Sequence, residues 1–212
     1  MEVKDLNLTS VQEARTLIEK ARKAQLRYAR FPQEEVDEIT RCVAEIAKRE
    51  AERLARMAVD ETGFGIYEHK VVKNLFAGST VYENIKDLRT IGIINEDKAG
   101  KTIDIATPAG VIAALVPCTN PTSTVIFKTL IAIKSGNGIV FSPHPSALKC
   151  IIETVSVLKD IARKVGAPED LISCMTMPTL EGTQELMKLS SLILATGGSA
   201  MVNAAYSSGV PA

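Results

Sequence analysis

The chain has 212 residues, 46% of them hydrophobic and 24% charged, as expected for a globular protein with ample material for a core. Lysine plus arginine equals aspartate plus glutamate at 25 each, so the balanced charge argues against nucleic acid or an anionic membrane surface as a partner. No apolar run reaches the roughly 18 residues that span a bilayer, and the start of the chain lacks the pattern of a secretory signal. Four scattered cysteines and two isolated histidines argue against a metal site or a disulfide framework and favour a reducing cytoplasm.

Three helices are expected in residues 1–88. Ser10 and Glu13 fit a capping box, in which the two side chains satisfy free amides of a first helical turn, and this helix extends to about Tyr28. From Gln33 up to Gly63, a run of apolar residues recurs at steps of three, four or their multiples, which predicts one long helix with a single buried stripe formed by Val36, Ile39, Val43, Ile46, Leu54 and Met57. The third helix is expected over residues 68–88.

The next segment has the pattern of a β-hairpin. Residues 90–94 and 101–106 are rich in residues that favour strands, and a polar loop joins them.

From residue 107 onward, short apolar runs alternate with helical segments. Four strands are expected, over residues 111–116, 138–141, 171–177 and 192–196, and a helix is expected after each, over residues 123–134, 147–164, 179–189 and 200–206. This alternation predicts an α/β fold of the Rossmann type, a doubly wound parallel sheet over residues 107–212. The sheet is expected to be incomplete at its C-terminal end, because the last helix closes where a further strand should begin.

Three loops are expected at the carboxyl ends of the strands, where open parallel sheets bind ligands. In the first, prolines on both sides hold Asn120 in a stiff segment. Its side-chain amide has two interpretations: it donates a hydrogen bond to a developing oxyanion, or it simply caps a helix or turn. Physical arguments from the residues alone slightly favour the cap.

The second loop contains Ser142, Pro143, His144 and Pro145. No carboxylate is available to orient the histidine, so a rigid turn is a better interpretation than an acid or base. The third loop contains Thr196, Gly197, Gly198 and Ser199, and two glycines before a helix allow phosphate to approach free amides. The usual dinucleotide fingerprint GxGxxG is absent, so this signal is weak by itself.

None of the four cysteines has the pattern of a nucleophile. Cys42 and Cys150 lie within helical segments and Cys174 within a strand, so we interpret all three as small core residues. Cys118 lies at a strand end but is also interpreted as a packing residue.

Taken in order, these segments resemble one family. The motifs Thr-Pro-Ala-Gly-Val-Ile at residues 107–112, Pro-x-x-Asn-Pro at 117–121 and Thr-Gly-Gly at 196–198 are similar to those of the aldehyde dehydrogenases. The stretches at residues 57–65, 119–128, 141–145 and 194–198 resemble the CoA-acylating branch, which includes acetaldehyde dehydrogenases and the N-terminal half of bifunctional aldehyde-alcohol dehydrogenases. The resemblance covers essentially the whole chain. It implies that the hairpin at residues 89–106 contributes to contacts between subunits of a homo-oligomer.

The resemblance implies a reaction in which a cysteine thiolate attacks a short-chain aldehyde, hydride passes to NAD, and coenzyme A takes the acyl group from the thioester. Asn120 would be the side-chain donor of the oxyanion hole. The pyrophosphate and nicotinamide would lie along Gly197, Gly198 and Ser199, and the adenosine beside residues 142–145. Pro117, Cys118, Thr119 and Thr196 would complete the cofactor site, with no metal. The family's nucleophilic cysteine does not match any of the four present, so these 212 residues alone are expected to be inactive.

Two departures from the family pattern affect these expectations. Ser199 and Ala200 stand where the acylating enzymes usually have Pro-Gly, which still allows a helix to begin. The loop after the second strand has no acid between Ser142 and Lys149, so we expect NAD with weaker discrimination against NADP. The alternative function is a truncated, non-catalytic nucleotide-binding or interaction protein.

Overall fold

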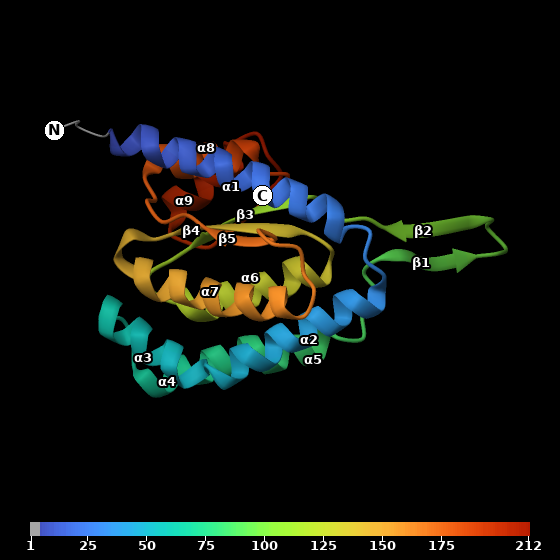
Figure 1. The fold of residues 1–212 in the computed structure, drawn as a ribbon, viewed down its shortest axis with the longest axis horizontal. Helices are drawn as coiled ribbons and strands as arrows, with labels where there is room; N and C mark the ends of the chain where they lie inside the picture. Colours follow the sequence, from blue (N-terminus) through green and yellow to red (C-terminus); the bar gives the residue numbers. More distant parts are fainter. Residues whose placement is uncertain (1–4) are drawn as a thin grey trace.

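The computed structural model describes residues 5–212 and shows a parallel sheet between layers of helices (Figure 1). The sheet has the order β5-β4-β3-β6, and all neighbouring strands pair in parallel. Its strands are β3 (Val111–Val116), β4 (Gly138–Pro143), β5 (Ile172–Cys174) and β6 (Leu192–Ala195). The expected α/β class with a Rossmann-type sheet is therefore confirmed, and all four strands end at the same edge.

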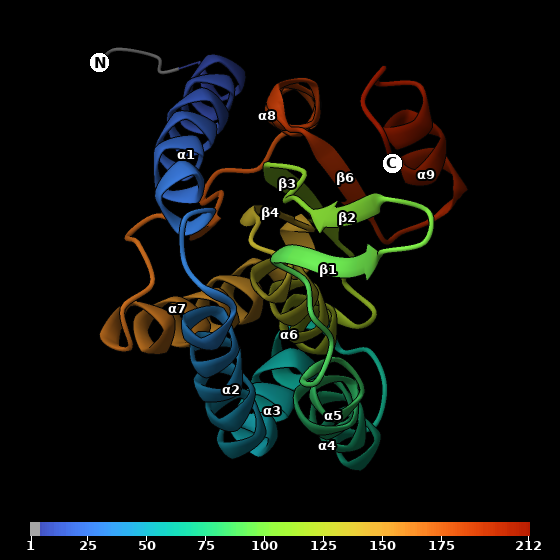
Figure 2. The same ribbon diagram turned by 90° about the vertical axis from the view of Figure 1, so that its right-hand side faces the viewer.

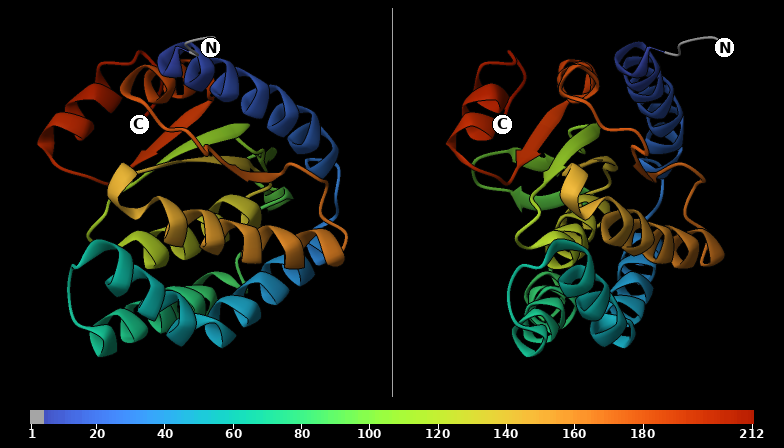
Figure 3. Two further views of the ribbon diagram at one scale, coloured as in Figure 1. Left: turned by 60° about the vertical axis from the view of Figure 1, so that its left-hand side comes forward. Right: turned by 90° about the vertical axis from the view of Figure 1, so that its left-hand side faces the viewer.

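Helices cover both faces of this sheet, which is why every residue of β3 is buried. One face packs on α6 (Pro121–Lys134) and α7 (Leu148–Lys164), and the 3-10 turn η2 (Pro145–Ala147) precedes α7. The other face packs on α1 (Leu6–Tyr28), α8 (Leu180–Leu189) and α9 (Ser199–Tyr206). Figure 3 shows these two helical layers on either side of the strands.

A further helical layer lies outside α6 and α7 (Figure 1). It contains α2 (Gln33–Arg49), α3 (Ala51–Thr62), α4 (Tyr67–Leu75), the π-helical turn η1 (Phe76–Thr80) and α5 (Val81–Ile85). The single helix expected from Gln33 to Gly63 is therefore two helices, which meet at Glu50, and the helix expected over residues 68–88 contains a π-helical turn. Gly63 ends α3 with a φ of 66°, as the sequence predicts.

The expected capping box at the start of the first helix is wrong. The helix begins five residues earlier, at Leu6, because Asp5 takes the N-cap position and accepts hydrogen bonds from the amides of Asn7 and Leu8. Ser10 and Glu13 lie on the face of α1 that turns toward the segment before α8. There the Ser10 hydroxyl accepts a bond from the Thr179 amide, and Glu13 accepts bonds from residues 176 and 177. The pair therefore fastens α1 to the sheet edge.

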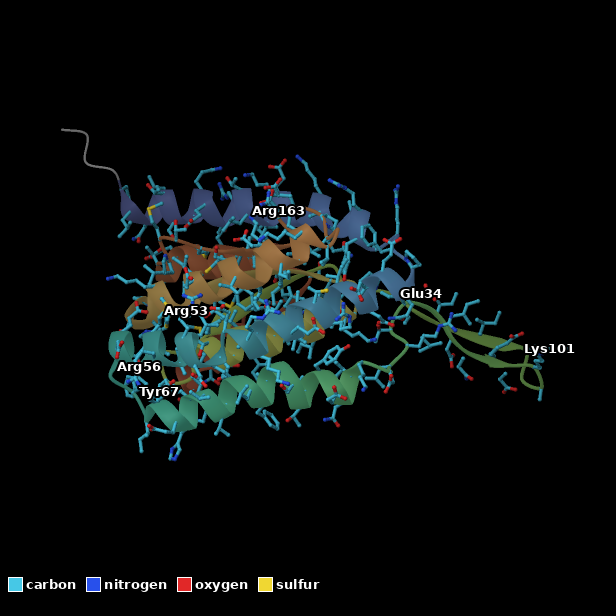
Figure 4. The ribbon with its side chains drawn as sticks, turned by 60° about the horizontal axis from the view of Figure 1, so that its bottom comes forward. Glu34, Arg53, Arg56, Tyr67, Lys101 and Arg163 are labelled. Carbon is cyan, nitrogen blue, oxygen red and sulfur yellow. The ribbon has the colours of Figure 1, made fainter. Side chains whose placement is uncertain are left out.

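The hairpin of β1 (Gly92–Asp97) and β2 (Thr102–Ala106) is confirmed and projects away from the sheet, toward the viewer in Figure 2. Lys101 lies at its tip (Figure 4). The isoleucines at 93, 94, 103 and 105 are 47–61% exposed, so both faces of the hairpin are open. A two-stranded ribbon of this kind buries little apolar surface by itself.

The residues after α9 return to the outer edge of the sheet. The Ile193 amide of β6 donates a hydrogen bond to the Pro211 carbonyl at 2.8 Å. The segment therefore begins to pair with the strand that forms this edge. Whether the sheet is incomplete stays a prediction.

The start of α7 is capped by a side chain from another helix. Glu61, near the end of α3, accepts hydrogen bonds from the amides of Lys149 and Cys150 at 2.8 and 2.7 Å. Ala147, at the N-cap position, has no side chain that could do this. Charge-assisted bonds at a helix N-terminus are stabilising, and leaving the two amides without a partner is costly.

Glu61→Ala is therefore expected to lower the free energy of unfolding by about 1–2 kcal/mol. Urea denaturation followed by circular dichroism measures the change. The control is Asp160→Ala, which removes an exposed carboxylate from the C-terminal part of the same helix α7 and should change stability much less. Equal effects of the two variants would contradict the capping role.

Candidate functional site

A cleft of about 710 Å³ opens at the carboxyl edge of the sheet. Its walls come from the segments that follow all four strands, and this is the edge at which open parallel sheets bind ligands. The cleft thus lies where the sequence predicts a nucleotide site.

The three expected loops meet in this cleft. Residues 117–120, 142–145 and 196–198 all line it. Ser199 is not among the lining residues and instead forms the first residue of α9 at the end of the third loop. The other eleven candidate residues, including Asn120, are brought together although they are separated by up to 81 positions in the sequence (from Pro117 to Gly198).

One wall of the cleft was not predicted from the sequence. Its remaining lining residues include Pro178, Thr179, Leu180 and Thr183. Thr183, on α8, hydrogen-bonds Ser142 at 2.7 Å between the two hydroxyl oxygens. The signal was available, because residues 178–180 follow β5 and so belong to the same sheet edge.

The glycine loop leaves space for a ligand. A Cβ atom added to Gly198 would meet nothing within 4 Å, so the backbone borders open cleft at this position. Among residues 5–212, no acceptor is found for the amides of Ser199 and Ala200 in the first turn of α9. Free amides at a helix start beside open space suit the phosphates of a dinucleotide.

The second loop is a rigid turn. The His144 Nδ1 atom accepts a hydrogen bond from the Ser146 amide at 3.1 Å, which caps the 3-10 turn η2. Ser142 and Pro143 are buried, whereas His144 and Pro145 are exposed at the cleft. The loop therefore offers a fixed surface against which an adenosine could pack.

Asn120 occupies the N-cap position of α6, but its side chain makes no capping bond. The Asn120 backbone carbonyl accepts from Thr124, while the side-chain Oδ1 accepts a hydrogen bond from Lys73 Nζ at 2.8 Å. Among the described residues, no acceptor is found for the Asn120 Nδ2 group. The amide at the cleft therefore keeps its donor for another partner.

A second, apolar groove of about 430 Å³ adjoins the cleft, since Thr124 and Thr196 line both. Aromatic and aliphatic side chains form most of its lining, and Val72, Phe76 and Phe127 among them are exposed, whereas Val81 is half-buried and Ala77 is buried. Lys73 lines it as well, and Lys73 contacts Asn120. The groove therefore continues from the cleft along an apolar surface to Lys73, which hydrogen-bonds the side-chain oxygen of Asn120.

A buried lysine, which the sequence analysis did not single out, joins the two strands that frame the site. Lys128, on α6, is 3% exposed and donates hydrogen bonds to the carbonyls of Leu115 and Leu194 at 2.7 and 2.6 Å. These residues lie near the ends of β3 and β6. Burial lowers the pKa of Lys128 to about 7.

The cysteines differ in their surroundings. Cys150 is buried. This burial, and to a smaller extent the nearby Glu61 carboxylate, raises the pKa of its thiol to about 12. Cys118 and Cys174 are half-buried and pack against the core on the α6–α7 side. The interpretation of Cys42 as a core residue is wrong, because it is half-exposed beside Glu38 and lies outside the core clusters.

Within residues 5–212, the structure contains no group of three or more metal-binding side chains. Over the same residues, no helix combines the length and apolar character that crossing a membrane requires.

The fold and the cleft at its carboxyl edge define an α/β protein of the Rossmann type. Residues 2–208 match the family model described as "Aldehyde dehydrogenase family", so the chain belongs to the aldehyde dehydrogenases. A probable aldehyde dehydrogenase from Listeria monocytogenes EGD-e has the same fold, with a TM-score of 0.97 and 55% identity over 98% of this chain. An acetylating aldehyde dehydrogenase from Geobacillus thermoglucosidasius is similar, with a TM-score of 0.97, 52% identity and 99% of this chain covered.

The curated relatives extend this similarity to the CoA-acylating branch. The bifunctional aldehyde-alcohol dehydrogenase AdhE of Escherichia coli K12 is 48% identical over 97% of this chain. An acetylating succinate-semialdehyde dehydrogenase of Clostridium kluyveri is 40% identical over 97%. The chain spans 23% of the first relative and 45% of the second, and 46–47% of the two solved structures.

Proposed function

We propose that these residues form the nucleotide-binding part and the oxyanion donor of an NAD-dependent, CoA-acylating aldehyde dehydrogenase. The observation that carries this proposal is the cleft, in which the glycine loop and the free amide of Asn120 face the same space. Acylating relatives at 40–48% identity support the reaction class. When bound, NAD supplies the hydride acceptor.

Each loop has a separate task in this proposal. The amides at the start of α9 hold the pyrophosphate, and the turn around His144 borders the adenosine. Asn120 Nδ2 donates a hydrogen bond to the oxygen that gains negative charge when the aldehyde is attacked. The attacking thiolate would come from outside these residues: Cys42, Cys150 and Cys174 line neither the cleft nor the groove, and Cys118, which lines the cleft, is half-buried and packs against the core. We therefore expect residues 1–212 alone to lack activity.

The apolar groove beside Asn120 is the proposed place for the aldehyde's carbon chain. Its aromatic and aliphatic lining favours a short, uncharged chain, because burial of apolar surface drives this contact. Coenzyme A enters the proposal as the acyl acceptor, and a related propionaldehyde dehydrogenase of Rhodopseudomonas palustris has been solved with CoA bound. We propose the cytoplasm as the location.

The projecting hairpin is the proposed contact between subunits. Its isoleucines are exposed on a ribbon that lacks a third strand within residues 5–212. A second copy of the protein could cover these side chains and pair with the free strand edges. The proposal therefore includes a homo-oligomer.

NADP is expected to bind nearly as well as NAD, within about tenfold in Kd, because the loop after β4 offers no acid to repel a 2′-phosphate. The Glu61 carboxylate lies beyond the end of this loop, where the amides of Lys149 and Cys150 hold it. Isothermal titration of residues 1–212 with each cofactor measures both affinities. A preference for NAD of many thousandfold would contradict the expectation. If neither NAD nor NADP binds, the proposed cofactor site is wrong.

A variant that adds a negative charge to this loop tests where the 2′-phosphate binds. Ser146→Glu adds an acid to the exposed end of the loop and should weaken NADP about tenfold more than NAD. Ser156→Glu, exposed on α7 and absent from the cleft lining, is the matched control. Equal effects of the two variants would place the adenosine elsewhere.

A further inference from the structure

Helix α4 holds the segment around Asn120 at three points, two in the loop and one at Thr122 in the first turn of α6. Lys70 Nζ donates a hydrogen bond to the Thr119 carbonyl at 2.7 Å, and Lys73 Nζ donates one to Asn120 Oδ1 at 2.8 Å. The buried Asn74 accepts one from the Thr122 hydroxyl at 2.8 Å. Positions 70, 73 and 74 share one face of a helix, so a single element fixes this loop.

The bond from Lys73 decides which way the Asn120 amide faces. An ammonium group only donates hydrogen bonds, so it stabilises the orientation with Oδ1 toward Lys73. The flipped amide would instead place its NH2 group against the ammonium, with two donors facing each other. The correct orientation leaves Nδ2 directed away from Lys73, free to donate within the site.

The same bond also makes Nδ2 a better donor. A hydrogen bond from a charged group is stronger than one between neutral groups, and hydrogen bonds polarise one another along a chain. Withdrawal of electron density toward Oδ1 leaves the Nδ2 hydrogens more positive. The benefit grows when an oxyanion forms, because that is when the Nδ2 hydrogens meet negative charge.

We propose that Lys73 is a positioning residue for the oxyanion hole, which orients and polarises the Asn120 amide. The inference rests on the proposed role of Asn120. Within residues 5–212 the Lys73 side chain is exposed and lines the apolar groove. It lies 47 residues before Asn120 in the sequence.

Kinetics of the complete acylating protein that carries these residues tests the proposal. Lys73→Met keeps the length and apolar stem of the side chain but removes the donor, and should lower kcat about tenfold with KM for the aldehyde unchanged within about twofold. Lys73→Arg restores a cationic donor and should recover kcat to within about threefold of the wild type. Lys20→Met, exposed on α1, is the matched control and should behave as wild type.

The double variant separates this inference from the proposed function. In an Asn120→Ala background, Lys73→Met should have no further effect on kcat, because the amide that it serves is gone. If Asn120→Ala lowers kcat but Lys73→Met does not, Lys73 has no positioning role. If Asn120→Ala itself leaves kcat unchanged, the proposed function of Asn120 fails first.

Nuclear magnetic resonance of the protein labelled with 15N at asparagine gives a readout besides activity. Loss of the ammonium at Oδ1 should move the Nδ2 resonance of Asn120 upfield in Lys73→Met, and Lys73→Arg should reverse most of this shift. An Asn120 resonance at the same position in wild type and Lys73→Met would overturn the proposal.

Discussion

Replacing Asn120 by aspartate or alanine is expected to lower the kcat of the complete acylating enzyme by about 10²–10³-fold, with a much smaller change in KM. Either substitution removes the Nδ2 donor, for which no acceptor is found in residues 5–212, from a residue that lines the cleft. The loss falls on kcat because the donor interacts most strongly after the aldehyde oxygen has become negative. Steady-state kinetics with a short aldehyde, NAD and CoA measures both constants.

Comparison of the two variants distinguishes a donor from a structural residue. The carboxylate introduced by Asn120→Asp would still accept the hydrogen bond from Lys73 and so keep the loop in place, but it presents a negative oxygen where the donor stood. Asn120→Asp should therefore be at least as damaging to kcat as Asn120→Ala. NAD affinity should stay within about threefold in both, since neither change touches the glycine loop.

The matched control is Asn84→Ala. Asn84 is exposed on α5, where its amide donates to the Thr80 carbonyl, and it lines neither the cleft nor the groove. Its removal should leave kcat unchanged. Wild-type kcat in Asn120→Asp would show that the amide is not the oxyanion donor.

The strands and the site edge could be predicted because their signals are local. Residues 111–116 form an unbroken apolar run, and such a run needs cover on both faces, which β3 has. Once the parallel strands are known, their carboxyl ends must meet at the same edge, so the loops at Asn120, Ser142 and Gly197 could be placed together from the sequence.

The contacts that tune the site could not be predicted, because their partners are far apart in the chain. Lys73 and Asn120 are 47 residues apart, and neither segment shows a periodicity that links them. Ser10 and Glu13 illustrate the opposite failure: their spacing fits a local cap, but they bond to residues 176–179 instead. The same residue types occur at the same spacing in a capping motif and on a helix face that packs against a distant loop. The spacing alone therefore does not distinguish the two.

The stability of the protein is expected to rise by about 1.5 kcal/mol between about pH 7 and pH 8.5, and Lys128→Met should abolish this rise. The Lys128 side chain is 3% exposed, and its burial lowers the pKa to about 7 from an ordinary value of 10.5. Between these two values the unfolded state binds one more proton than the folded state. The contribution of Lys128 to the free energy of unfolding therefore increases with pH across this interval and becomes constant above 10.5.

The range of the experiment is limited by the thiols. Burial raises the pKa values of Cys150 and Cys174 above the ordinary value of 9.0, and their contribution has the opposite sign, because the unfolded thiols lose their protons first. Urea denaturation at several pH values up to about 8.5 avoids most of this contribution. Lys20→Met, exposed on α1, should keep the wild-type slope. An unchanged slope in Lys128→Met would show that another group carries the proton.

The slope is a better readout than the stability at a single pH. In Lys128→Met, the methionine fits the apolar surroundings, which raises the free energy of unfolding. The Leu194 carbonyl loses the hydrogen bond from Lys128, which lowers it, so the two effects oppose each other at any single pH. The Leu115 carbonyl keeps a second donor, the Thr196 amide at 3.2 Å.

A neutral amine at Lys128 still carries two N–H donors, and the carbonyls of Leu115 and Leu194 use both of them. The link between β3 and β6 therefore persists whether or not Lys128 is protonated, and the Asn120 loop and the glycine loop stay in place while stability changes with pH.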